Sequence, residues 1–152
     1  MVRREAGVTD GTAKRTPEVS LEDVFLKAAS GLEREDPRAE VVAEALRYLQ
    51  QGFDAHYDGG PGSPTDDGVL VGDNAYALSV QTIARLDEPR FVEVAGRMIR
   101  DGAGRIAAGD RVTARTWTPH LAELLDIISE EGPERSGRRI EASMEGLRGG
   151  VG

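Results

Sequence analysis

Cysteine is absent from the 152 residues of this chain. Disulfide frameworks and thiolate metal sites are therefore excluded. No apolar run approaches the ~20 residues that a membrane-spanning helix requires, so we expect no transmembrane segment. The first residues are charged (Arg3, Arg4, Glu5) and then polar, without the apolar stretch of a secretory signal. These absences together predict a cytoplasmic protein.

Lysine is nearly absent as well, because Lys14 and Lys27 are the only lysines among 19 basic residues. The chain carries 27 acidic residues and a net charge of -8. Such a surface repels phosphate backbones, so we expect no nucleic-acid partner. Many carboxylates with few lysines are typical of proteins from salt-accumulating cells and favour a halophilic origin. A GC-rich genome, which favours arginine codons, is the alternative explanation.

Period-2 alternation is also missing, so the sequence predicts no strand. Apolar residues recur instead at helical spacing, and we predict an all-α fold, a helical bundle of about five main helices. Residues 1–19 lack periodicity and are predicted to be a flexible N-terminal tail. Residues 20–148 are predicted to form a single helical domain.

Capping residues, or a proline in the first turn, mark four helix starts. These starts are Ser20, Asp36-Pro37, Asp87-Glu88-Pro89 and Thr118-Pro119. The stretch from about Val69 to Leu86 is apolar on nearly every side, which predicts a central, buried helix. A short last helix is expected around Ile140, Met144 and Leu147, because the chain beyond it is rich in glycine.

Three glycines lie in the helix predicted after Pro89, namely Gly96, Gly102 and Gly104. Each costs roughly 1 kcal/mol of helix stability relative to alanine. Their presence predicts that a neighbouring element approaches closely. The alternative is a helix that breaks after Gly102.

Aspartates gather around a segment of helix-breaking residues, 58–68. Asp54 and Asp58 are four residues apart, so both point from one face if the preceding helix continues. Carboxylate oxygens are the ligands that Mg²⁺ prefers, and the pair predicts a Mg²⁺ site. Alternatively, the loop aspartates only cap the next helix. The two histidines, His56 and His120, lack zinc-ligand spacing, and no Gly-x-Ser-x-Gly elbow marks a serine hydrolase.

The same region resembles the isoprenyl (polyprenyl) diphosphate synthases over about residues 54–110. The residues that match the family's pattern are Asp54, Asp58, Gly62, Pro64, Thr65, Leu70, Gly72 and Asp73. The resemblance implies a helical fold and an isoprenoid ligand. It also implies metal binding by Asp54 and Asp58, and substrate binding by Thr65 and Asp73.

The departures from that family fall on its chemistry. Ala55 stands where the first aspartate-rich motif has its second Asp. Gly59, Gly60 and Pro61 replace the arginines that hold diphosphate. The N-terminal Gly-Lys-x-x-Arg-Pro motif and the second aspartate-rich motif have no counterpart in this sequence. Because metal and positive charge stabilise the departing diphosphate, we expect a shortened, non-catalytic relative.

Three functions follow as alternatives. The first is a non-catalytic prenyltransferase-like partner or lipid-binding subunit. The second is an unrelated helical module that acts through protein–protein contacts, with another protein or as a homo-oligomer. The third is a small Mg²⁺-dependent enzyme acting on a phosphorylated or diphosphate substrate. An apolar cavity beside Asp54 and Asp58 would favour the first, and aspartates that face solvent without a cavity would favour the second.

Overall fold

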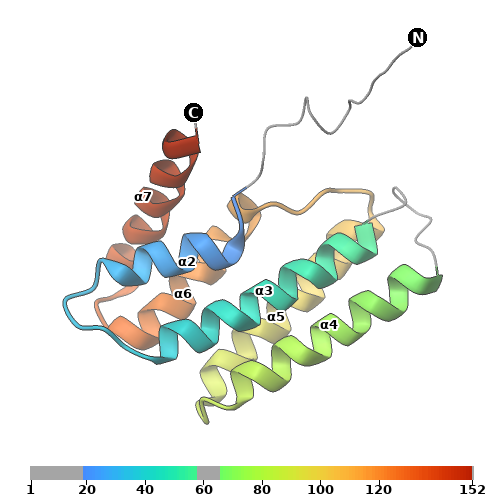
Figure 1. Cartoon of the computed structure of the whole chain (residues 1–152), viewed down its shortest axis with the longest axis horizontal. Helices are drawn as coiled ribbons and strands as arrows, with labels where there is room; N and C mark the ends of the chain where they lie inside the picture. The colour runs from blue at the N-terminus through green and yellow to red at the C-terminus, as the bar shows by residue number, and fades with distance from the viewer. Residues whose placement is uncertain (1–18, 58–65, 152) are drawn as a thin grey trace.

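The computed structural model describes residues 19–57 and 66–151 of the chain. Figure 1 shows an all-α bundle, as predicted, and the described residues contain no strand. None of the helices in these residues is long and apolar enough to cross a membrane. The α-helices, labelled as in Figure 1, are α2 (Leu21–Ser30), α3 (Arg38–Tyr57), α4 (Asp66–Ala84), α5 (Pro89–Ala107), α6 (Thr118–Ser129) and α7 (Pro133–Val151), with a 3-10 helix, η1, at Ala114–Trp117.

Local signals in the sequence set several helix starts. Ser20 caps α2, because its hydroxyl accepts the backbone N–H three residues further on at 3.0 Å. Asp36 accepts the backbone N–H of Arg38 at 2.9 Å where α3 begins. Glu88 caps α5 in the same way, just before Pro89. The starts predicted from capping residues and proline are therefore confirmed for these three helices.

The core lies around α3, which packs against α2, α4, α5 and α6. Its inner face is closed to solvent and includes Val42, Leu46, Leu49 and Phe53. Trp117 of η1 is 1% exposed and stacks on Phe53 with the ring centroids 5.0 Å apart. Burial of each such large side chain contributes roughly 1.5–3 kcal/mol.

The prediction of a central, buried helix over residues 69–86 is wrong. That segment belongs to α4, which lies at one side of the bundle, against α3 and α5 (Figure 1). Leu70 and Val71, on α4, are 68% and 60% exposed. Apolar composition indicates that a helix is covered on most sides, but it does not say what covers it. Among the described residues, α3 and α5 cover only one side of α4, and α3 takes the central position.

The last helix, α7, is longer than predicted and spans 19 residues. Ile140 and Met144 bury their side chains in the core, at 0% and 1% exposure. Ser143 donates a hydrogen bond to the carbonyl of Val24 at 2.6 Å, which ties α7 to α2. This packing sustains a helix whose glycine content alone predicts fraying. The bundle therefore contains one more long helix than the sequence predicts.

Candidate functional site

Gly52 and Gly72 fix the contact between α3 and α4. Gly52 of α3 faces the ring of Tyr76, and Gly72 of α4 faces the ring of His56. A Cβ at either glycine would lie closer than 3.0 Å to the opposing ring. Each helix therefore offers one glycine to an aromatic side chain of the other. Because the two contacts are reciprocal, they set the register of the pair and place His56 beside α4.

His56 meets Asp73 and Tyr76 at this contact. Its Nε2 lies 3.1 Å from Oδ1 of Asp73. Its ring stacks on Tyr76 with centroids 5.1 Å apart and planes 17° apart. The side chain of Asp73 is 65% exposed and that of His56 is 19% exposed. A donor or acceptor arriving from solvent thus reaches the carboxylate first, with the imidazole behind it.

These three side chains form the polar end of a hollow of about 530 Å³, here named the α3–α5 pocket. Its other side comes from α5 and is apolar: Ile99, Ala103, Ile106 and Ala107. Small-molecule sites range over roughly 300–1,000 Å³ and combine apolar walls with a few polar groups. The α3–α5 pocket has this size and this composition.

Tyr76 supplies a hydroxyl that no described residue satisfies. Its oxygen is buried and lacks a hydrogen-bond partner in the described part of the chain. Burial raises the pKa of Tyr76 far above its usual range, and the negative charge of Asp73 raises it further. The group therefore stays a neutral hydroxyl. Leaving such a group unpaired costs about 1–3 kcal/mol, which a ligand's hydrogen bond would recover.

An aromatic column connects the pocket to the core. Tyr76 packs edge-on against Phe53 with centroids 5.6 Å apart. Phe53 in turn stacks on Trp117, and Trp117 packs edge-on against His120. Because Trp117 is the only tryptophan of the chain, it is a built-in fluorescent reporter of this column.

The structure places the predicted site residues differently. Asp73 lines the α3–α5 pocket. Asp54 lies on α3 but is exposed and does not line it. Asp58 and Thr65 fall outside the described residues. Within the described residues, no three His, Asp or Glu side chains gather closely enough to hold a metal ion. The predicted Mg²⁺ site therefore stays a prediction.

Sequence reasoning missed the part that Tyr76 plays. In the sequence this residue is one position within the apolar stretch of residues 69–86, with no role of its own. His56 was considered only as a zinc ligand, for which its spacing from His120 is unsuitable. Glycine followed four residues later by an aromatic ring, in Gly52-to-His56 and in Gly72-to-Tyr76, is the signal that could have paired the two helices.

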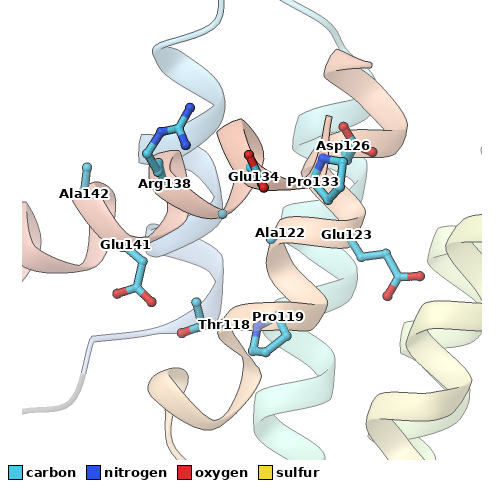
Figure 2. A pocket seen from close by; sticks show the side chains of 11 residues that line it. Thr118, Pro119, Ala122, Glu123, Asp126, Pro133, Glu134, Arg138, Glu141 and Ala142 are labelled. Carbon is cyan, nitrogen blue, oxygen red and sulfur yellow. The ribbon is translucent and has the colours of Figure 1, made fainter. Parts of the chain in front are cut away.

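A second hollow, of about 1,050 Å³, lies between α6 and α7. Figure 2 shows Pro119 and Ala122 on one wall, and Arg138 and Glu141 on the other. Two of the carboxylates at this hollow take part in contacts that stabilise the fold. Glu123 pairs with Arg97 at 2.7 Å, and Asp126 accepts the backbone N–H of Gly132, also at 2.7 Å. We therefore place the candidate site in the α3–α5 pocket.

Comparison with known proteins does not identify the site. Comparisons with models of protein families, with curated proteins and with solved structures each found no match to this chain. The resemblance to isoprenyl diphosphate synthases is neither supported nor contradicted by them. Functional inference for this chain rests on the geometry of the α3–α5 pocket.

Proposed function

We propose that this chain is a non-catalytic binding protein whose ligand is an elongated, mostly apolar molecule with one hydrogen-bonding end. The observation that carries the proposal is the α3–α5 pocket, with an apolar wall on α5 and a polar end at His56, Asp73 and Tyr76. Burying apolar surface drives binding, at about 25 cal/mol per Å². The polar end orients the molecule, because one buried hydroxyl there lacks a partner among the described residues.

The charge of the pocket favours an uncharged end on the ligand. None of its described lining residues is lysine or arginine, and Asp73 contributes a negative charge. A free diphosphate would meet repulsion here, whereas an alcohol can donate to Asp73 and, once a small side-chain movement uncovers the buried Tyr76 hydroxyl, accept from Tyr76. A prenyl alcohol, such as the C15 alcohol farnesol, has this shape and this end. The ligand class agrees with the isoprenoid that the family resemblance implies, although the pocket lies beside Asp73 and not beside Asp54.

Binding is measured by titrating farnesol against the emission of Trp117. We expect saturable binding that Ala103→Phe abolishes, because a phenyl ring at this position fills the pocket. Ala142→Phe is the matched control, since it adds the same ring to an exposed alanine of α7 beside the other hollow. Equal binding by wild type and Ala103→Phe, or loss of binding only in Ala142→Phe, would contradict the assignment to this pocket.

The polar end is tested separately with Tyr76→Phe, which removes only the hydroxyl. One hydrogen bond contributes about 0.5–1.5 kcal/mol net, so we expect farnesol to bind roughly 3–10-fold more weakly. Farnesene, the corresponding hydrocarbon, cannot make this bond, and its affinity is expected to stay the same. A uniform loss for both probes would show that Tyr76 shapes the pocket without contacting the ligand's hydroxyl.

The non-catalytic part of the proposal has its own assay. We expect no chain elongation from labelled isopentenyl diphosphate, an allylic diphosphate and Mg²⁺. Ala55 and the missing arginines at 59–61 leave too little charge to stabilise a departing diphosphate. Turnover that both Asp54→Ala and Asp58→Ala abolish would instead establish the Mg²⁺-dependent enzyme.

A further inference from the structure

The outer face of α4 carries one continuous uncharged stripe. It consists of Leu70, Asn74, Ala77, Gln81 and Ala84, all of which are exposed. Their spacings alternate between four and three residues, which is the spacing of a coiled-coil seam. In this chain the seam has no neighbouring helix among the described residues, because α3 and α5 lie against the opposite face.

Such a stripe is unusual for this protein. The chain carries 27 acidic residues, yet Asp73 is the only charged residue from 68 to 84. Leu70 and Val71 are the large hydrophobic side chains that stand exposed in the described residues. Exposed apolar surface bounded by polar residues is typical of an association site. The sequence of α4 is typical of a helix that is covered on all sides. Its outer face fits this pattern only if another element covers the stripe.

We propose that a second copy of this chain covers the stripe, with the two α4 helices antiparallel about a two-fold axis at Ala77. In that arrangement Leu70 faces Ala84 of the second copy, so a large side chain meets a small one. Asn74 faces Gln81 of the second copy, and the two amides can hydrogen-bond. Ala77 faces its own counterpart, where two methyl groups let the backbones approach closely. The two-fold axis repeats each contact, which makes the stripe self-complementary.

The distribution of charged residues also favours self-association through this face. Two copies with a net charge of -8 each repel one another wherever carboxylates meet. On the stripe no carboxylates meet, because the antiparallel arrangement offsets Asp73 along the helix from its counterpart. Leu78, which is half-buried in one copy, lies beside the seam and meets its own counterpart. Val71 meets the aliphatic stem of Arg85 of the second copy. Pairing thus buries the apolar residues that the described part of a single copy leaves exposed.

The oligomeric state of the full chain tests the proposal. In sedimentation velocity at 1–100 µM protein, in 0.15 M and in 1 M KCl, we expect a reversible dimer that salt strengthens. Ala77→Glu places two carboxylates on the axis and is expected to raise the dimer Kd at least about tenfold. Ala142→Glu is the matched control, because it adds the same charge to an exposed alanine of α7. A wild-type monomer at 100 µM in both salts, or a dimer that Ala77→Glu leaves intact, would overturn the proposal.

The register is tested by cross-linking, which the absence of native cysteine makes specific. Asn74→Cys and Gln81→Cys are each treated alone, and then mixed, with a short bis-maleimide. The antiparallel pair predicts that the mixture cross-links far more than either variant alone. Efficient cross-linking of each variant to itself, with no gain on mixing, would show a parallel pair and overturn the arrangement.

Discussion

Replacing Gly102 by alanine is expected to destabilise the fold, although alanine is the better helix former. Gly102 is buried on α5, and the ring of Phe53 fills the space beside it. A Cβ there would lie within 3.0 Å of three atoms of that ring. The ring has no room to retreat, because Trp117 stacks on it at 5.0 Å and Tyr76 packs edge-on at 5.6 Å.

The magnitude follows from two opposing terms. Alanine gains about 1 kcal/mol over glycine inside a helix. Forcing an extra methyl group into a packed core costs typically 1–3 kcal/mol. Gly96, on the same helix, has no atom of another described residue within 4 Å of its Cβ position, so Gly96→Ala receives the gain without the cost. The unfolded-state effect of the two substitutions is the same, and their stabilities are expected to differ by about 1–3 kcal/mol.

Urea unfolding followed by circular dichroism measures this difference. We expect a raised midpoint for Gly96→Ala and a lowered midpoint for Gly102→Ala. A double-mutant cycle with Phe53→Leu isolates the contact, because a smaller side chain at this position relieves the overlap. The cost of Gly102→Ala is expected to shrink in the Phe53→Leu background. If both glycine variants stabilise equally, Phe53 does not occupy the space at Gly102 and the proposed packing is refuted.

Three further outcomes are expected. Leu78→Ala, at a half-buried position, is expected to destabilise the monomer clearly less than Leu46→Ala, which removes a fully buried side chain and costs about 2–5 kcal/mol; equal losses in thermal melts at low protein concentration would contradict this. Burial lowers the pKa of His120 below its ordinary 6.5, so the unfolded chain binds this proton more readily and stability is expected to fall as pH drops below 6.5. His120→Gln is expected to flatten that part of a pH–stability curve, and an unchanged slope would argue against it. Finally, the melting temperature is expected to rise from 0.1 to 2 M KCl, because the Debye length falls from about 10 Å at 0.1 M to about 3 Å at 1 M and carboxylate repulsion weakens; a flat or falling curve would count against a halophilic origin.

Local chemistry explains why much of the fold could be predicted. Ser20, Asp36 and Glu88 cap helices through side chains that reach backbone groups two or three residues away. Such capping interactions lie within one helical turn, so the helix starts can be predicted from the sequence. What the sequence does not contain is the identity of the neighbour. Residues 69–86 have the composition of a buried helix, and only the tertiary arrangement shows that α4 lies at the side.

The candidate site was less predictable for the same reason. Asp73 could be singled out by its place in a family-like pattern. The contribution of Tyr76 depends on Gly52, which lies 24 positions earlier in the chain on a different helix. The three glycines of the predicted helix after Pro89 also differ, since only Gly102 faces a close neighbour, whereas Gly96 and Gly104 meet nothing within 4 Å. The three glycines of this helix therefore have different surroundings, and their spacing in the sequence does not show which of them faces a neighbour.

The reciprocal contacts of Gly52 with Tyr76 and of Gly72 with His56 also bear on the kinetics of ligand binding. Sliding α3 along α4 by one turn would drive both rings into helix backbone, so the two helices that carry the polar end of the α3–α5 pocket cannot shift past each other. These contacts therefore oppose opening of the pocket by sliding of α3 along α4, a motion of microseconds to milliseconds. Ligand association is expected to follow a single phase whose rate rises linearly with farnesol concentration. A rate that reaches a plateau in stopped-flow traces would reveal a slow rearrangement of the pocket and contradict this expectation.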